Sequence, residues 1–298
     1  MDTFRSGLNS KKMKNKLWLI YAIVTTITWG IWGAFIEIPE KAGFPATLGY
    51  SIWALTMIPC ALIALKFINF KLEVDKKSIF WGLLIGLTGA GGQLLLFEAL
   101  REGPAYIIFP IISLYPVVTI GLSIWISKER TNKRSWIGII LALIAIFLLS
   151  YMKPEDSDVK GYLWLGLSVL VFIMWGAQGF FMKTANNSMS AEGIFTYMAI
   201  SGILMVPIAL WMTDFNQNIN WGFKGPYLAA LIQVLNAVGA LTLVYAMRYG
   251  KAIVVSPMTS LSPMITIVLS LIIYAVMPNP AMIVGFGFAL AAIYLFST

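Results

Sequence analysis

The sequence predicts an all-α integral membrane protein with ten transmembrane helices, arranged as two inverted five-helix repeats with the N- and C-termini in the cytoplasm. Three observations support this fold: an apolar composition, ten long apolar stretches and an internal repeat. Hydrophobic residues make up 59% of the 298 residues and charged residues only 11%, whereas a soluble domain is closer to half apolar and a quarter charged. The composition therefore excludes an ordinary soluble protein.

The apolar residues are gathered into stretches of helical membrane-spanning length. A transmembrane helix needs about 20 consecutive apolar residues. No stretch shows the alternation of apolar and polar residues that is typical of an outer-membrane barrel strand, so helices are the expected spanning elements. The ten stretches cover residues 17–36, 46–68, 79–100, 105–127, 136–151, 161–182, 192–212, 227–247, 253–276 and 281–297.

The sequence contains an internal repeat. Residues 97–123 and 244–270 lie 147 positions apart, and 12 of their 27 aligned residues are identical. The pattern WGIWGAF at 29–35 returns as WGAQGFF at 175–181. Each copy contains five predicted helices, and an odd number makes the second copy enter the membrane from the opposite side. The repeats are therefore expected to be inverted.

The charges orient the predicted helices. With a cytoplasmic N-terminus, 16 of the 21 Lys and Arg residues fall on the cytoplasmic side, as the positive-inside rule requires. The net charge of +8 is then a topology signal, and without a compact basic face it predicts no nucleic-acid partner. We expect a multi-pass cell-membrane protein of the bacterial inner-membrane type, divided into a disordered basic cytoplasmic tail (1–15), a first repeat (16–151), an extracytoplasmic linker (152–160) and a second repeat (161–298).

The residue inventory argues against an enzyme. The chain has no His and a single cysteine, Cys60, which removes His-based acid–base chemistry, His-rich metal sites and internal disulfides. It contains no GxxxxGK[ST] phosphate loop. We expect no catalytic reaction, no metal and no cofactor. The partners are expected to be the lipid bilayer and a small molecule, and a monomer and a homodimer are both open.

Further motifs carry a family resemblance. Besides the repeated Trp-Gly pair, residues 113–119 read SLYPVVT, 128–130 read KER and 136–138 read WIG. Together they resemble the EamA family of the drug/metabolite transporter superfamily over about residues 16–298. The second copy reads MPNP at 277–280, where we expect the counterpart of the KER run, so the charged helix end is missing there.

The resemblance implies a function. It points to a secondary active transporter that moves small metabolites by alternating access, first of all an exporter of amino acids or related compounds. A carrier of sugars, nucleosides or cationic drugs is an alternative, and a channel is a more distant one. A channel would differ by showing flux that does not saturate and no counterflow.

Polar and aromatic side chains within the apolar stretches are the candidate substrate ligands. Polar groups are costly in hydrocarbon and are functional candidates there. Amides offer donors and acceptors without charge, and aromatic walls are typical of small-molecule pockets. The alternatives are interhelical hydrogen bonding for the amides, above all for Gln233, and packing for the tryptophans. The candidate substrate-binding residues are Trp29, Trp32, Gln93, Tyr115, Trp175, Gln178, Asn236 and Ser262.

Paired prolines mark candidate hinges. Pro110 and Pro116 in the first copy match Pro257 and Pro263 in the second. Each proline removes a backbone donor and clashes with the preceding turn, so a spacing of six residues predicts two kinks in each helix. The alternative to a hinge is static curvature.

Glu98 is the candidate for coupling transport to protons. It is the sole acid well inside a predicted span, and a partly buried carboxylate can titrate when its access changes. Arg101 follows three residues later, at the spacing of a helical ion pair. A structural ion pair is therefore the alternative to coupling or to binding of a substrate amine.

Overall fold

The computed structural model describes residues 16–151, 161–274 and 277–297, and all regular structure in these residues is helical. The predicted tail (1–15) and linker (152–160) lie outside the described residues. The helices are α2 (Leu17–Phe35), α3 (Glu37–Lys41), α4 (Ala46–Phe67), α5 (Lys76–Glu102), α6 (Ala105–Ser113), α7 (Pro116–Trp125), α8 (Lys133–Leu149), α9 (Leu163–Ala185), α10 (Ala191–Leu204), α11 (Val206–Trp211), η1 (Phe223–Tyr227), α12 (Leu228–Tyr249), α13 (Ala252–Thr259), α14 (Ser262–Tyr274) and α15 (Pro280–Ser297).

Nine helical units in the described part of the chain are long and apolar enough to cross a membrane. Their bounds agree with the predicted stretches to within a few residues. The remaining predicted stretch forms α8, which has 17 residues and so stands at the lower limit of membrane-spanning length. The tenth transmembrane helix therefore stays a prediction.

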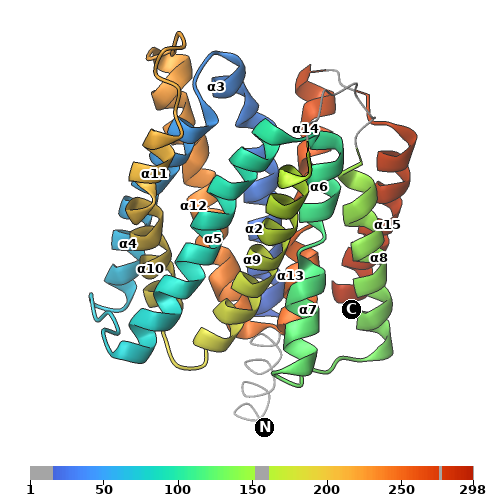
Figure 1. The fold of residues 1–298 in the computed structure, drawn as a ribbon. Helices are drawn as coiled ribbons and strands as arrows, with labels where there is room; N and C mark the ends of the chain where they lie inside the picture. Colours follow the sequence, from blue (N-terminus) through green and yellow to red (C-terminus); the bar gives the residue numbers. More distant parts are fainter. Residues whose placement is uncertain (1–15, 152–160, 275–276, 298) are drawn as a thin grey trace.

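The two sequence halves are interleaved. Figure 1 shows α2, α5, α9, α12 and the broken helices α6/α7 and α13/α14 in the centre, α4 with α10/α11 on one flank and α8 with α15 on the other. The most extensive helix pairs join different halves, namely α8 with α15, α5 with α9 and α2 with α12. We call the end at which α2 begins the lower end, as in Figure 1, and the opposite end the upper end.

Glycines bring the first helix of each half against the fourth helix of the other. A Cβ on Gly30 in α2 would lie 2.3 Å from Ile265 Cβ in α14, and a Cβ on Gly176 in α9 would lie 2.3 Å from Val118 Cβ in α7. Ile265 and Val118 are 147 residues apart, so the repeat reproduces the crossing. Such close approach is how membrane helices gain packing without a hydrophobic driving force.

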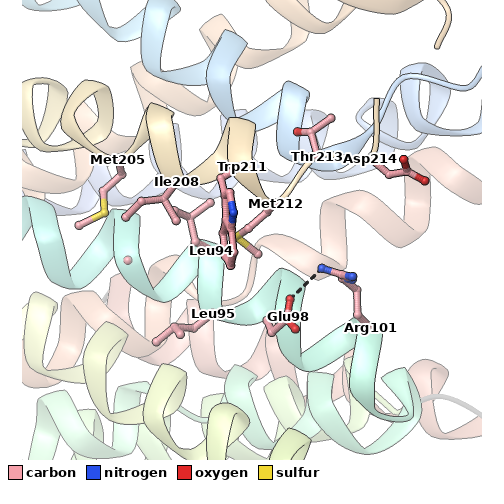
Figure 2. A pocket seen from close by; sticks show the side chains of 11 residues that line it. Leu94, Leu95, Glu98, Arg101, Met205, Ile208, Trp211, Met212, Thr213 and Asp214 are labelled. Atoms are coloured by element: carbon pink, nitrogen blue, oxygen red, sulfur yellow. Dashed lines mark hydrogen bonds and ion pairs between the residues drawn. The ribbon is translucent and has the colours of Figure 1, made fainter. Parts of the chain in front are cut away.

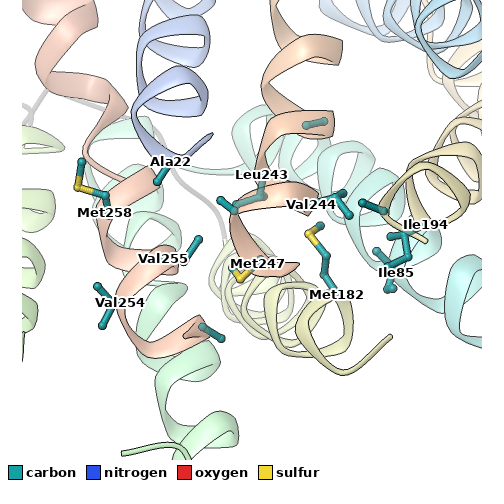
Figure 3. Close-up of a cluster of buried hydrophobic side chains, with 14 of the residues drawn as sticks. Ala22, Ile85, Met182, Ile194, Leu243, Val244, Met247, Val254, Val255 and Met258 are labelled. Atoms are coloured by element: carbon teal, nitrogen blue, oxygen red, sulfur yellow. The ribbon is translucent and has the colours of Figure 1, made fainter. Parts of the chain in front are cut away.

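The largest buried apolar cluster fills the lower half of the central helices and continues along α8 and α15 toward the upper end. Figure 3 shows Leu243 and Met247 of α12 between Val255 of α13 and Met182 of α9. These four side chains are buried and belong to the largest hydrophobic cluster of the described residues, which also includes parts of α4, α8, α10 and α15. The clusters at the upper end are much smaller. The lower end is therefore the better packed of the two.

Each of the two helices with paired prolines breaks once, not twice as predicted. The breaks separate α6 from α7 and α13 from α14, at the second proline of each pair. Pro116 has no N–H to donate to Ile112 O, and the Tyr115 N–H donates to that carbonyl instead, at 2.9 Å. The break is thus a tight turn with its backbone donors satisfied. Pro110 and Pro257 remain inside continuous helices, so the expectation of a second kink is wrong.

The structure also corrects the alignment of the two copies after their fourth helices. Asn132 Oδ1 accepts the Ser135 N–H at the start of α8, and Asn279 Oδ1 accepts the Met282 N–H at the start of α15. These equivalent helix caps are 147 residues apart. The run MPNP therefore matches residues 130–133, and the counterpart of the KER run is residues 275–277, which are uncharged.

The glycine crossing makes a stability prediction with a control in the same helix. Gly176→Ala places a methyl group against Val118 and should destabilise the protein by about 1–3 kcal/mol through overpacking. Gly166, also in α9, has open space where its Cβ would be, so Gly166→Ala should be neutral or stabilising because alanine favours helix. Thermal unfolding in detergent checks the pair, and equal melting temperatures would contradict the close crossing.

Candidate functional site

Two tryptophans make equivalent hydrogen bonds across the interleaved halves. Trp29 Nε1 in α2 donates to Asn236 O in α12 at 3.3 Å, and Trp175 Nε1 in α9 donates to Gly89 O in α5 at 3.2 Å. The acceptors are 147 residues apart. Each indole also lies over a glycine of the same helix as its acceptor, Gly239 for Trp29 and Gly92 for Trp175. The indoles therefore fix the central helices against one another.

The second tryptophan of α2 leads to an amide network. Trp32 Nε1 donates to Gln233 Oε1 at 2.9 Å, and Gln233 Nε2 donates to Gly49 O at 3.3 Å. Asn236 Nδ2 reaches the same Gln233 oxygen at 3.4 Å. Because Gln233 is buried at 5% exposure and bonded at both ends, it joins α2, α4 and α12.

The Gln178 and Gln93 amides differ in whether they make hydrogen bonds. Gln178 Nε2 in α9 donates to Ile85 O in α5 at 3.1 Å. Gln93 in α5 is half-buried, and its side chain makes no hydrogen bond within the described residues. Gln93 is next to Gly92, the glycine covered by Trp175. Its amide is thus the one candidate amide that makes no side-chain hydrogen bond in the described chain.

Tyr115 links the two helix breaks. Its hydroxyl and the Ser260 hydroxyl are 2.8 Å apart, and its ring meets the Trp175 ring edge-on with centroids 6.1 Å apart. Ser262 follows the break of the other half, and its carbonyl lies against Gly30. Contacts therefore run from Trp175 through Tyr115 and the α13/α14 break to Gly30, the neighbour of Trp29 in α2; we call this path the central contact chain.

The candidate side chains at the centre of the bundle carry no formal charge. They are indoles, amides, a phenol and hydroxyls, and they contain no ion pair among the described residues. Such a set can stack on a solute, hold a cation against aromatic faces and exchange hydrogen bonds. Whether each of the eight predicted residues contacts substrate stays a prediction.

The two ends of the bundle are packed differently. At the lower end α7 packs against α13, and α9 packs against α12 and α13. The repeat relates these pairs to α14 with α6, and to α2 with α5 and α6, at the upper end. None of these three upper pairs packs extensively in the described residues. The lower end is therefore closed more tightly than the upper end.

Charged groups reinforce the lower closure, and sequence reasoning missed them as a unit. Glu129 Oε2 accepts the Ile253 N–H in the first turn of α13 at 3.2 Å, where a carboxylate complements the helix dipole. Lys251 Nζ donates to Arg130 O. Lys183 Nζ donates to Met247 O at 2.9 Å and Gly250 O at 2.6 Å, at the end of α12. In the sequence, the KER run at 128–130 was the signal that could have pointed to Glu129.

Glu98, the coupling candidate, lies elsewhere. Arg101 Nη1 is 3.0 Å from Glu98 Oε2, and both residues line a cavity of about 910 Å³ between α5 and α11 (Figure 2). With 3.6 residues per turn, Glu98 and Leu95 point roughly 140–200° away from Gln93 around α5. Glu98 is therefore the sole predicted site residue in this cavity, and it is not part of the central contact chain.

Comparisons with known proteins support a transport protein. The model of a family described as the EamA-like transporter family matches residues 16–151 and 159–298. An uncharacterized protein of Methanocaldococcus jannaschii is 37% identical over 132 residues, which cover 44% of this chain and 95% of that protein. Protein LicB of Haemophilus influenzae is 24% identical over 212 residues, or 67% of this chain and 70% of LicB.

A solved crystal structure shares the fold. It aligns with a TM-score of 0.75 and 12% sequence identity, and the match covers 93% of this chain and 98% of that chain. At this identity the likeness concerns the fold alone. The alignment with the Methanocaldococcus jannaschii protein is about as long as one repeat of the chain.

The two kinds of amide can be separated by stability. Gln233→Leu leaves the Trp32 indole N–H and the Gly49 carbonyl without their partner and should cost about 1–3 kcal/mol. Gln93→Leu breaks no hydrogen bond among the described residues, so its melting temperature should stay close to that of the unmodified protein. Unfolding of both variants in the same detergent checks this, and a larger loss for Gln93→Leu would contradict the assignment.

Proposed function

Since the chain belongs to the EamA-like transporter family, and is therefore a multi-pass membrane protein of the drug/metabolite transporter type, we propose that it moves a small polar metabolite by alternating access. The observation that carries the proposal is the unequal closure of two ends that the repeat makes equivalent. In an inverted repeat, the helix pairs that close one end have equivalents at the other end. The two ends can therefore exchange their packing.

The exchange follows from the helix pairs. In the described conformation α7/α13 and α9/α12 close the lower end. Their counterparts α14/α6 and α2/α5 would close the upper end in the second conformation. The breaks at Tyr115 and Leu261 lie between the upper and lower parts of the fourth helices, so they are placed to act as the hinges. The central contact chain lies at these breaks and would face each side in turn.

The side chains that bond at the lower closure have counterparts of a different residue type at the upper end. The counterparts of Glu129 and Lys251 at an offset of 147 are Val276 and Pro104. The counterpart of Lys183 at the offset of 146 that relates α2 to α9 is Glu37. None of these can repeat the carboxylate–N–H or ammonium–carbonyl bonds. We infer that the conformation closed at the lower end is the more stable one in the absence of substrate.

We place the lower end in the cytoplasm. The excess of Lys and Arg on that side supports this orientation, as does the start of α2 there (Figure 1). The proposal includes ten transmembrane helices, with α8 as the shortest, and repeats at 16–151 and 161–298. The described conformation would then be open toward the outside.

Amino acids or related compounds are the substrates we propose, and export the direction. The central side chains supply hydrogen bonds and aromatic faces without a fixed charge, which suits a small solute that is neutral overall. Sugars and nucleosides fit the same groups, and lipophilic cations fit the indoles through cation–π contacts. Glu98 is not favoured as the coupling group, because it is paired with Arg101 at the periphery; a proton as coupling ion remains a proposal without an assigned residue.

Counterflow in proteoliposomes tests the transporter. Vesicles loaded with unlabelled amino acid should accumulate the labelled compound transiently, and the initial rate should saturate. Gln93→Ala and Asn236→Ala should each lower this rate at least tenfold, because each variant removes an amide that we propose as a substrate ligand. Gln217→Ala, in the exposed loop after α11, is the control and should leave it unchanged. Saturable counterflow unaffected by both site variants would place the site elsewhere; flux without counterflow would indicate a channel.

Cysteine accessibility tests the lower closure. Cys60 is the sole cysteine, so Cys60→Ser gives a background in which Val255→Cys, at a fully buried position of α13, can be labelled by a membrane-impermeant maleimide. Glu129→Gln removes the charge that stabilises the start of α13, worth about 0.3–1 kcal/mol. Labelling from the cytoplasmic side should rise about two- to fivefold. Glu102→Gln, exposed at the upper end of α5, is the control. Unchanged labelling in Glu129→Gln would contradict the role of Glu129 in the lower closure.

A further inference from the structure

The cavity beside α5 arises from a helix break that only the second half contains. α10 ends at Leu204 and α11 begins at Val206, and Pro207 in the first turn of α11 cannot continue the hydrogen-bond ladder. α10 packs extensively against α5, whereas α11 does not among the described residues. The equivalent helix of the first half, α4, runs unbroken from Ala46 to Phe67. Within the described residues, the groove between α5 and α11 therefore has no counterpart between α12 and α4, which pack extensively.

The groove is amphipathic along its length. Its deeper part is lined by apolar side chains, among them Leu94, Leu95, Met205 and Ile208. Its upper end carries the Glu98–Arg101 pair, and Asp214, after the end of α11, also lines it (Figure 2). From Gly91 to Arg101 the groove follows about 15 Å of α5. The part of α5 with apolar lining, from Gly91 to Leu95, accounts for about 6 Å of this length. An apolar groove with a charged end matches part of one acyl chain and a polar headgroup.

The exposed side chains of the groove place it toward the bilayer. Trp211, which lines the groove (Figure 2), is 85% exposed. An exposed tryptophan near the end of a membrane helix is typical of the headgroup level. Arg101 is 62% exposed and Glu98 34% exposed, so both can still bind a group from outside. The groove faces away from Gln93 around α5 and is separate from the central contact chain.

The charges select the headgroup. The upper end holds two carboxylates, of Glu98 and Asp214, and one guanidinium, of Arg101. A guanidinium binds phosphate through paired N–H donors, and a primary ammonium has three donors for carboxylates. The excess negative charge disfavours an anionic lipid. We propose that this groove is a binding site for a zwitterionic phospholipid with a primary amine, of the phosphatidylethanolamine class, with its phosphate on Arg101 and its ammonium on Glu98 and Asp214.

Lipid titration of the delipidated, detergent-purified full chain tests the site. Added dioleoyl phosphatidylethanolamine should raise the melting temperature saturably, and native mass spectrometry should show one tightly held lipid. Dioleoyl phosphatidylglycerol, with the same chains and an anionic headgroup, should bind at least tenfold more weakly. Arg101→Ala and Trp211→Ala should each weaken phosphatidylethanolamine binding about tenfold, and both residues are exposed enough that the fold should persist.

Glu37→Gln is the matched control. Glu37 also forms an exposed ion pair at the upper end of the bundle, but it does not line the groove, so lipid affinity should not change. Equal affinity for the two lipids, no saturable binding, or binding unaffected by Arg101→Ala would overturn the proposal. Competition between the lipid and a counterflow substrate would also overturn it, because the groove would then be a solute port. Lipid binding is measured without transport, so its failure is distinct from failure of the proposed function.

Discussion

The close crossing of the first helix of each half with the fourth helix of the other is the constraint on which the arrangement depends. Thr119 Oγ1 donates to Gly176 O at 2.7 Å, and Thr266 Oγ1 donates to Gly30 O at 2.9 Å. In a bilayer such contacts replace the hydrophobic effect as the source of helix association. Because each crossing joins different halves, neither half is a separate body, and any movement must divide the chain along lines other than its sequence repeat.

The helix breaks next to these crossings give the proposed movement a place to occur. Tyr115 directly precedes α7, and Ser262 is the first residue of α14. The carbonyl of each lies against a glycine of the crossing. The lower parts, α7 and α13, pack together, while α6 and α14 do not pack extensively in the part of the chain that the structure describes. A change of angle at the breaks would therefore exchange which end is packed while the crossings stay intact, which is what alternating access requires of an inverted repeat.

Apolar length and the repeat were sufficient to predict the helices, because both are local properties of the sequence. The pairing of Trp29 with Asn236 and of Trp175 with Gly89 was not predictable, since indole donors bond to backbone carbonyls that any residue supplies. The number of helix breaks was missed for a related reason: a proline inside a short helix, such as Pro110, removes a single bond and does not by itself end the helix. Gln233 and Gln93 look alike in sequence and differ only in what surrounds them.

The departures from symmetry carry the specific properties of this chain. The repeat by itself would make the two ends equal in energy, and a carrier with equal ends has no preferred resting side. Glu129, Lys183 and Lys251 bind at the lower end, and their counterparts Glu37, Pro104 and Val276 cannot do so. The break before α11 likewise has no counterpart in α4. A relative aligns with this chain over about the length of one repeat, and within the chain the two repeats differ at separate positions. In this chain the shared positions maintain the crossings, and the divergent ones distinguish one side of the membrane from the other.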